Sequence, residues 1–402
     1  MKPSEIRRLI QMKPVELNAT RRRLAACHDV FELRAVARRH IPRPVFDYVD
    51  GGSDEELSMR ANQRAFRRYR FQPRAVAGVT SVDTTARLLG RDLPLPLVLA
   101  PTGYTRMMHP DGEPGAARAA QRHGLPYALS TMSTTSIEDV AAAAQPDLWF
   151  QLYIQRDTGM TKELVSRAAA AGYRVLVVTI DTLVTGHRTR DERNGLVIPP
   201  ELTLKTLVSI GTRPGYWVRM LRNEAIDFAN FTETAEGLTI ARTGKMFSPT
   251  VGWDDIASLR DQWAGQLILK GPVSPDDARR ATSMGVDGFQ LSNHGGRQLD
   301  RTIAPVEMIA PVREAVGPDV SLLVDSGVRH GSDIAVALAL GADATAIGRA
   351  YLYGMMVGGE AGADKAIDLL AEQFRRTLNL LGVPSAAELR TLGPSLLAGG
   401  PS

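Results

Sequence analysis

The sequence predicts a (β/α)8 barrel of the α/β class, and this prediction depends on two observations. Eight short apolar, β-branched runs recur after residue 90, and helix-like segments separate them. Several runs, such as LVLA at 97–100 and LLVD at 322–325, are apolar on both faces, which is typical of parallel strands covered on both sides. Eight such units in about 260 residues favour a closed barrel over an open doubly wound sheet. No GxGxxG motif follows any run, so the dinucleotide-binding fingerprint of the open sheet is missing.

The segments between the runs carry helix start and stop signals. Ser136 and Ser274 are expected to cap two helices, with Pro275 in the first turn of the second. Gly172 and Gly341 are placed to end two others. We expect the eight strands at Leu95–Ala100, Pro126–Ser130, Leu148–Tyr153, Arg174–Asp181, Gln266–Lys270, Val286–Ser292, Val320–Asp325 and Asp343–Gly348.

The remaining segments are expected to extend the barrel at both ends and over its active-site face. Asp29 and Glu32 precede an amphipathic pattern and predict a capped helix in the N-terminal region. A gap between the fourth and fifth strands is too long for one helix and predicts a lid. The Gly/Pro/Ser-rich end is expected to fray after Gly393. The predicted parts are a helical lead-in at 1–90, the barrel at 91–385 with its insertion at 182–250, and a tail at 386–402.

Composition places the chain among ordinary globular proteins. Of its 402 residues, 44% are apolar and 23% are charged, which argues against disorder. The net charge of +4 is small, so no nucleic-acid partner is predicted. Cys27 is the only cysteine, which rules out an intramolecular disulfide and favours a reducing compartment. No apolar run reaches the roughly 18 residues of a membrane span, and no signal-peptide core is found, so we expect a cytoplasmic protein.

Polar side chains follow nearly every predicted strand, at the end where barrel enzymes place their chemistry. Lys270 ends an apolar strand, and a partly desolvated ammonium there suits stabilising an anion or forming a Schiff base. His294 lies in the glycine-rich turn SNHGGRQLD, and imidazole is the usual general base near neutral pH. Asp181, after the fourth strand, is placed to orient His294. Arg188 and Arg297 are suited to clamp a carboxylate.

The last two strands indicate a phosphate site. They end in DSGVRHG at 325–331 and GRA at 348–350, where glycine N–H groups, a helix N-terminus and arginine form the usual phosphate site of a barrel. Together these features describe a phosphate-bearing cofactor, a cation beneath it, a base and a carboxylate clamp. FMN and a 2-hydroxy acid account for all four. A Schiff-base aldolase using Lys270 and a non-enzymatic binding barrel are the alternatives. No HExxH or CxxC pattern occurs, so no metal site is predicted.

At this point the motifs show a family resemblance. SNHGGRQLD at 292–300 resembles the active-site signature of the FMN-dependent 2-hydroxy-acid dehydrogenase/oxidase family, which includes glycolate oxidase, mandelate dehydrogenase and L-lactate dehydrogenases. The resemblance covers residues 28–385 and is closest to the actinobacterial L-lactate dehydrogenases. The other matching motifs are FDYVDGGSDEE at 46–56, APTG at 100–103, HPDGE at 109–113, FQLY at 150–153, LLVDSGVRHGSD at 322–333 and IGRAYLYG at 347–354.

The resemblance implies a role for each matching residue. His294 is implied to be the base, paired with Asp181, and Lys270 to stabilise the anionic reduced flavin. Hydride transfer, with His294 taking the hydroxyl proton, and a carbanion route, with His294 taking the α-proton, use the same residues. The residues implied to bind substrate are Tyr48, Tyr153, Arg188 and Arg297. Those implied to hold FMN are Pro101, Thr102, Gly103, Ser130, Gln151, Thr179, Lys270, Ser292, Asp325, Gly327, Arg329, Gly348 and Arg349.

Three departures from the family pattern bear on substrate and electron acceptor. Gly103 stands where well-known oxidases carry alanine, which favours a dehydrogenase using a quinone or cytochrome over an oxidase that makes H2O2. Met132 and Thr185 replace an aromatic residue and a leucine of glycolate oxidase, and both are expected to line the substrate side-chain pocket. L-lactate or a larger 2-hydroxy acid is therefore expected rather than glycolate. The resemblance also implies a homotetramer.

The insertion carries apolar and aromatic residues beside basic ones, within residues 203–250. This mixture favours docking on an anionic bilayer at the inner face of the membrane, or on an electron-accepting partner. The alternative is a mobile lid on the barrel and nothing more. The residues concerned are Leu204, Lys205, Leu207, Val208, Arg213, Trp217, Val218, Arg219, Leu221 and Arg222.

Overall fold

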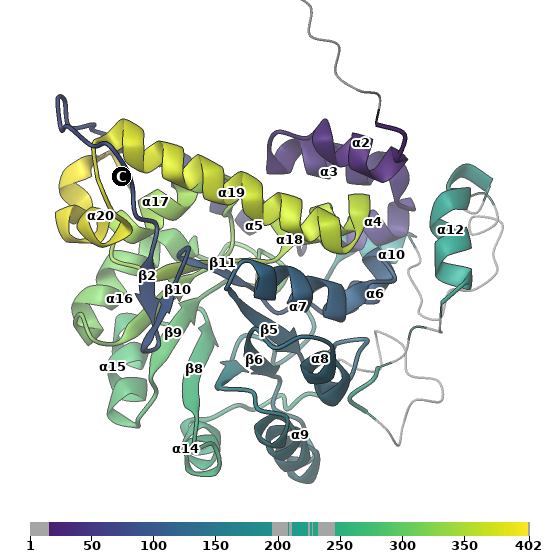
Figure 1. Ribbon diagram of the computed structural model, residues 1–402. Helices are drawn as coiled ribbons and strands as arrows, with labels where there is room; N and C mark the ends of the chain where they lie inside the picture. Colours follow the sequence, from purple (N-terminus) through teal and green to yellow (C-terminus); the bar gives the residue numbers. More distant parts are fainter. Residues whose placement is uncertain are drawn as a thin grey trace, which may run out of the picture.

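Eight parallel strands close into a barrel at the centre of the molecule (Figure 1). The computed structural model describes residues 16–194, 208, 211–223, 226, 228–231 and 246–400. The strands follow one another around the barrel in chain order, and the last pairs with the first, as predicted. They are β4 (Leu97–Leu99), β5 (Pro126–Ser130), β6 (Asp147–Leu152), β7 (Val175–Thr179), β8 (Gln266–Gly271), β9 (Gly288–Leu291), β10 (Ser321–Val324) and β11 (Ala344–Ile347).

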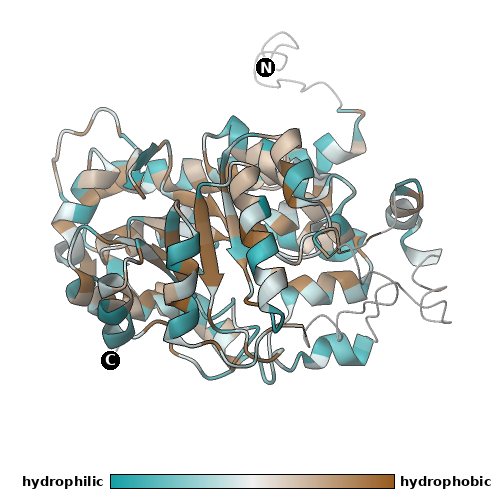
Figure 2. Ribbon diagram, turned by 90° about the horizontal axis from the view of Figure 1, so that it is seen from below, coloured by the Kyte–Doolittle hydropathy of each residue, from teal (hydrophilic) through white to brown (hydrophobic). Residues whose placement is uncertain are grey.

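Helices cover the outside of the barrel, and their ends follow the predicted signals. Ser136 and Ser274 accept hydrogen bonds from N–H groups three residues later, and Gly172 and Gly341 adopt positive φ after the helices they end. The barrel strands are apolar, and the outer helices turn polar faces to solvent (Figure 2). These helices are α7 (Gly112–Arg122), α8 (Ile137–Ala143), α9 (Thr158–Ala170), α14 (Trp253–Gln262), α15 (Pro275–Ser283), η1 (Pro305–Met308), α16 (Ile309–Val316), α17 (Gly331–Ala339), α18 (Arg349–Gly358) and α19 (Glu360–Leu381).

Four helices precede the barrel, of which the first three pack against α18 (Figure 1) and the fourth contacts η1. The predicted cap is present: Asp29 Oδ1 accepts from Glu32 N at 2.7 Å, and Glu32 Oε2 accepts from His28 N at 2.6 Å. The third of these helices ends beside the opening of the barrel and carries Tyr48 there. The four are α2 (Ala19–Ala25), α3 (Val30–His40), α4 (Arg43–Asp50) and α5 (Leu57–Arg68).

The region before the barrel is not purely helical, which corrects the prediction of a helical lead-in. β2 (Ala86–Leu88) and β3 (Arg91–Leu93) form a hairpin whose turn residues Leu89 and Gly90 both have positive φ. Leu89 is buried with the inward-facing side chains of the barrel, and its carbonyl accepts from Arg174, just before β7. The hairpin therefore closes the N-terminal end of the barrel. Strands of three residues are too short to show alternation in the sequence.

The chain end is also more ordered than predicted. After α20 (Ala386–Leu392) and η2 (Gly393–Leu396), β12 (Leu397–Ala398) pairs antiparallel with β1 (Arg70–Phe71). The prediction of fraying after Gly393 is therefore wrong for residues 393–400. Burial of Leu396 and the ladder to β1 supply the contacts that composition does not reveal.

The insertion after β7 contributes two described helices, α10 (Thr189–Asn194) and α12 (Pro214–Leu221). α12 lies at the edge of the molecule (Figure 1), where the hydroxyl of buried Tyr216 donates to Met107 O of α6 (Thr105–Met108) at 2.9 Å. Of the residues named for docking, Leu204, Lys205 and Leu207 lie outside the described residues. No described helix is long and apolar enough to cross a membrane.

Candidate active site

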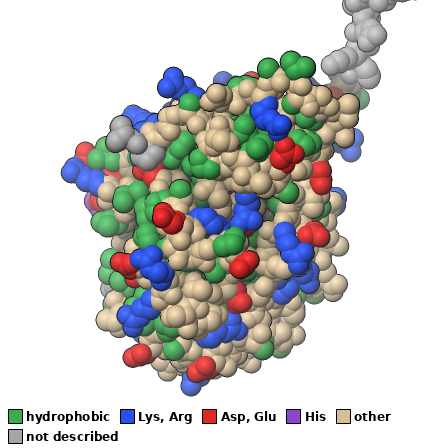
Figure 3. All heavy atoms as spheres, turned by 90° about the vertical axis from the view of Figure 1, so that its left-hand side faces the viewer, with side chains coloured by type: hydrophobic (Ala, Val, Ile, Leu, Met, Phe, Trp, Pro, Cys, Tyr) green, Lys and Arg blue, Asp and Glu red, His purple; other side chains and the backbone are tan. Residues whose placement is uncertain are grey.

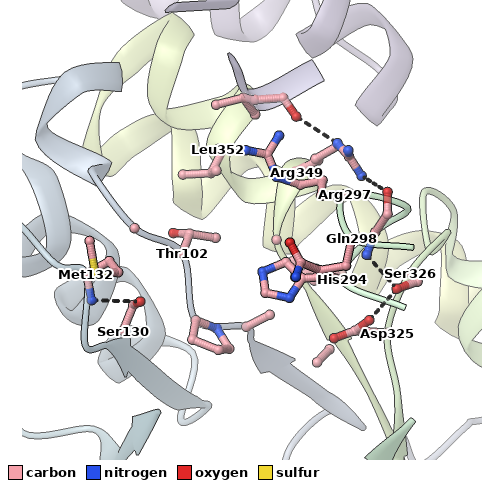
Figure 4. Close-up of a pocket in the computed structure, with 18 of the residues that line it drawn as sticks. Thr102, Ser130, Met132, His294, Arg297, Gln298, Asp325, Ser326, Arg349 and Leu352 are labelled. Atoms are coloured by element: carbon pink, nitrogen blue, oxygen red, sulfur yellow. Dashed lines mark hydrogen bonds between the residues drawn. The ribbon is translucent and has the colours of Figure 1, made fainter. Parts of the chain in front are cut away.

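A cavity opens at the carboxyl ends of the barrel strands. Its lining comes from strand ends, from the end of α4 and from the start of α18. Figure 4 shows Ser130 and Met132 on one side of it and His294, Gln298 and Asp325 on the other. The predicted site residues that line it are Tyr48, Pro101, Thr102, Gly103, Ser130, Met132, Tyr153, Thr185, Arg188, Lys270, His294, Arg297, Asp325, Gly327, Arg329, Gly348 and Arg349.

His294 is held in a left-handed turn after β9. Its φ is 59°, and those of Gly295 and Gly296 are 69° and 73°. A left-handed conformation at a non-glycine residue costs about 1–3 kcal/mol and persists only where the surroundings enforce it. Here Ser292 Oγ accepts from His294 N at 3.0 Å, and Ser326 Oγ accepts from Gly295 N at 2.9 Å. The strain presents the imidazole to the cavity.

The two ring nitrogens of His294 have different partners. Nδ1 lies 3.1 Å from Asp181 Oδ1, and because a carboxylate only accepts, Nδ1 carries the proton. Nε2 lies 3.4 Å from the Tyr153 hydroxyl and is left with a lone pair. Burial and the nearby Lys270 cation lower the pKa of His294, which keeps the ring neutral near pH 7. His294 is therefore set up to accept a proton at Nε2.

Asp181 remains ionised although its side chain is buried behind His294. Burial alone raises the pKa of Asp181, but the interaction with His294 and the charge of Lys270 lower it to about 2. A carboxylate so placed fixes the tautomer and stabilises the imidazolium that forms when the base takes a proton.

Two arginines and a tyrosine form the cationic side of the cavity. The guanidinium carbons of Arg188 and Arg297 lie 5.7 and 4.8 Å from the ring centre of Tyr48, one ring serving both. Burial and the neighbouring Arg188 lower the pKa of Arg297 to about 10. Arg297 forms no salt bridge within the described part of the chain. Arg188 Nη1 lies 3.7 Å from Asp191 Oδ2, and its Nε has no hydrogen-bond partner there. This pair is suited to bind a carboxylate between them.

The rest of the cavity lining has features that suit the ring and the phosphate of FMN. Lys270 is only 4% exposed, faces the cavity and forms no salt bridge among the described residues. Gly348 lies at the start of α18, whose first N–H groups lack helical partners, and a Cβ there would contact only Thr102. Buried Arg329 lines the same end. A buried cation, a helix N-terminus and an open glycine edge fit the charge and shape of FMN.

Four predicted site residues lie behind the lining rather than in it. Gln151 joins two of its neighbours, since its Oε1 accepts from Ser130 Oγ at 3.0 Å and its Nε2 donates to Thr179 Oγ1 at 2.9 Å. Ser292 caps the turn of His294, and Asp181 stands behind the imidazole. These groups position the side chains that face the cavity.

Several residues of the lining were missed by the sequence prediction. Phe247 stacks on Tyr153, with ring centres 4.6 Å apart, and Tyr104 packs edge-on against Tyr48 at 5.8 Å. Ser326 ties Gly295 to the end of β10. Phe247 lies near the end of the insertion, where no strand pattern marks it, but Tyr104 and Ser326 directly follow residues that were predicted.

Comparison with known proteins gives a consistent result. The chain matches the family described as FMN-dependent dehydrogenase over residues 37–396. It is 44% identical to a Mycobacterium tuberculosis protein with the provisional name L-lactate dehydrogenase, over 96% of this chain and 95% of that protein. It is 37% identical to an L-lactate oxidase of Nostoc, over 90% and 96% of the two chains. The crystal structure of a monotopic membrane protein, (S)-mandelate dehydrogenase, superimposes with a TM-score of 0.88 at 36% identity, covering 93% of this chain and all of that one.

The barrel and its cavity thus define a flavin enzyme of the (β/α)8 class. The chain belongs to the FMN-dependent dehydrogenase family, and FMN is its cofactor.

The state of His294 leads to a pH prediction. We expect the rate of FMN reduction by a 2-hydroxy acid to rise with pH through a group titrating below 6.5 and to be flat at neutral pH, because only neutral His294 accepts a proton. Asp181→Asn removes the charge that raises the pKa of His294, so the acid limb should move to lower pH. The plateau should fall by about a hundredfold to ten-thousandfold. Stopped-flow reduction across pH measures both, and an acid limb that moves upward in the variant contradicts the assignment.

Proposed function

We propose that the protein oxidises an L-2-hydroxy acid, L-lactate foremost, to the 2-oxo acid. The observation that carries the proposal is the placing of the unprotonated Nε2 of His294 in one cavity with two arginines and a buried lysine. A 2-hydroxy acid offers one group to each: a carboxylate to the arginines and a hydroxyl to the base. A Schiff-base aldolase would use Lys270, but the arginine pair and the turn of His294 would have no role in its reaction.

Each residue of the chain then has a defined part in the reaction. Arg188, Arg297 and Tyr48 bind the carboxylate and orient the α-carbon. His294 removes the hydroxyl proton, or the α-proton in a carbanion route, and Asp181 stabilises the resulting imidazolium. FMN, when bound, supplies the acceptor for the two electrons that leave the α-carbon.

The cofactor contacts are proposed residue by residue. Lys270 faces the flavin ring and stabilises negative charge on it. The flavin ring is held by Pro101, Thr102, Gly103, Ser130, Gln151, Thr179 and Ser292, the last three through the groups that they position. The ribityl chain is held by Asp325, and the phosphate by Gly327, Arg329, Gly348 and Arg349.

The substrate side chain is proposed to lie against Met132 and Thr185. Met132 is 7% exposed and adapts its shape easily, while Thr185 is small and exposed at the cavity edge. L-lactate fits the names of several relatives, and (S)-mandelate, the substrate named for the structural relative, is the larger candidate.

The electron acceptor is proposed to be a quinone or cytochrome, with oxygen as the alternative that the Nostoc relative supports. A homotetramer in the cytoplasm is the expected state, with peripheral contact at the inner face of the membrane through the insertion.

A flavin-bleaching experiment tests the proposed function. Anaerobic addition of L-lactate to the yellow protein should bleach the flavin, while D-lactate should not. His294→Gln should keep bound FMN and slow bleaching by about a hundredfold to ten-thousandfold, because the base is lost. A panel of longer L-2-hydroxy acids ranks the substrates. Unchanged bleaching in the variant would falsify the role of His294, and no bleaching by any 2-hydroxy acid would contradict the function.

Gly103→Ala tests the acceptor. A Cβ at Gly103 would lie 3.0 Å from Met132 Cβ and 3.1 Å from Met132 O, so the variant narrows the space on that side of the cavity. We expect the reoxidation rate with oxygen to rise relative to that with a soluble quinone. The matched control is Met132→Ala alone, which enlarges the cavity beside Gly103 without adding a Cβ at residue 103, so its ratio should not rise. Equal ratios in wild type and Gly103→Ala contradict the idea that space here controls oxygen.

The exposed side of α12 is proposed to dock on an anionic bilayer. Val218 and Leu221 are 46% and 79% exposed, and Arg222 lies beside them on the surface. Figure 3 shows the other side of the molecule, where hydrophobic, basic and acidic side chains are interspersed. The monotopic membrane attachment of the structural relative supports the proposal.

Vesicle binding checks this surface. Val218→Asp with Leu221→Asp should lower co-sedimentation with phosphatidylglycerol vesicles and slow reoxidation by vesicle-borne quinone, while flavin bleaching by substrate stays intact. Leu380→Asp is the matched control, because Leu380 is 72% exposed on α19. If the wild type does not sediment with these vesicles, the surface is no membrane site and α12 belongs to a lid.

A further inference from the structure

The guanidinium group of Arg349 is committed to backbone carbonyls. Its Nε donates to Val49 O at 2.7 Å, Nη1 to Gly295 O at 2.8 Å and Nη2 to Gly51 O at 2.6 Å. Figure 4 shows the group with hydrogen bonds on two sides, above the turn of His294. Three of its five donors are therefore occupied by the protein itself. An arginine whose side chain binds the phosphate is expected instead to direct its guanidinium donors into the cavity.

The three carbonyls belong to the two segments that carry the substrate-binding groups. Val49 and Gly51 lie at the C-terminal end of α4, next to Tyr48, and Gly295 directly follows His294. Arg297 binds the same end of α4, through the carbonyls of Tyr48 and Gly51. Carbonyls at a helix end lack helical partners and carry partial negative charge, so a cation there is well placed.

The turn of His294 needs support on its carbonyl side. Its N–H groups are held by the hydroxyls of Ser292 and Ser326, as described above. On the carbonyl side, Arg349 holds Gly295 O, and Ser53 N donates to Gly296 O at 2.8 Å. Both contacts on this side come from residues far away in the chain. Arg349 thus joins the carbonyl side of the turn to α4, beside the contacts that Arg297 makes with the same helix end.

We propose that Arg349 is a positioning residue that sets the distance between Tyr48 and His294, and that its guanidinium does not bind the cofactor phosphate. The inference rests on the proposed function of the two residues that it connects. The backbone N–H of Arg349, at the start of α18, stays available for the phosphate. This replaces the side-chain part of the role that the sequence predicted for Arg349.

Arg329 provides the matched control. It is also a buried arginine lining the cavity, but among the described residues its guanidinium donates only through Nη1, to Val328 O at 2.7 Å. Its other guanidinium donors are free to bind a phosphate at the end of the cavity that Arg329 lines. The two arginines thus separate a positioning role from a phosphate-binding role.

The test compares the affinities for FMN and riboflavin, which differ only by the phosphate. For Arg349→Met, we expect the ratio of the two dissociation constants to stay within about threefold of wild type. For Arg329→Met, we expect the preference for FMN to fall at least about tenfold, since a charge-assisted phosphate contact is lost. A preference that falls as far in Arg349→Met as in Arg329→Met overturns the proposal.

Substrate kinetics supply the second readout. Arg349→Met should raise KM for the 2-hydroxy acid, lower kcat by about tenfold or more and displace the acid limb of the pH profile, because the His294 turn loses its hydrogen bonds through Arg349 to the end of α4 beside Tyr48. Arg349→Lys keeps the charge but not the three-pronged geometry, so it should not rescue. The proposal is overturned if Arg349→Lys restores wild-type kinetics. It is also overturned if the variants differ from wild type in thermal stability alone.

The test stays decisive even if Arg349→Met is unstable or the proposed function is wrong. Asp50, beside the anchored carbonyls, also accepts from Tyr353 OH at 2.7 Å and from Arg190 at 3.1 Å, so α4 stays docked without Arg349. If Arg349→Met does not fold, Arg349→Lys carries both measurements. If the proposed function is wrong, no 2-hydroxy acid reduces the flavin of the wild-type protein. The ratio of the dissociation constants for FMN and riboflavin reports on Arg349 in either case.

Discussion

The left-handed backbone from His294 to Gly296 is the constraint on which the site depends. An ordinary turn after β9 would send the imidazole elsewhere, so hydroxyls at Ser292 and Ser326 and the contacts from the N-terminal region hold it in place. Asn62 and Asn293 add a reciprocal pair of amide hydrogen bonds, each 2.8 Å long. Strain at one residue is thus balanced by several partners from three parts of the chain.

The charges of the cavity follow from what surrounds that turn. Lys270, Arg188 and Arg297 gather in a poorly solvated space, where like charges repel strongly. Asp181 behind His294 and Asp191 beside Arg188 offset part of this charge. The cavity is therefore organised for negative groups, one at the arginine pair and one near Lys270, and this is the reason that a neutral imidazole serves there as a base.

Strand ends were predictable because their chemistry lies in short contiguous motifs. The eight strands, the paired caps and the cavity position of Lys270 and His294 follow from local pattern. The hairpin of β2 and β3 did not, since Leu89 adopts a positive φ that no local rule favours, and its burial inside the barrel compensates. Arg349 shows the same limit: its motif marks a phosphate site, but the direction of its side chain is decided by α4, about 300 residues earlier. Phe247 lies in an insertion with no strand or helix pattern to place it.

The pairing of β1 with β12 bears on how the molecule is made. Arg70 finds its ladder partner only at Ala398, and the carbonyls of Val49 and Gly51 find theirs only at Arg349. Contacts so distant in sequence carry a high loop-closure cost and form late in folding. On the ribosome, the segment bearing Tyr48 must therefore wait, with apolar surface uncovered, until nearly the whole chain has emerged. Assembly of the catalytic cavity is consequently a late event in biogenesis, and the N-terminal helices are the part of the nascent chain most exposed to chaperones and proteases.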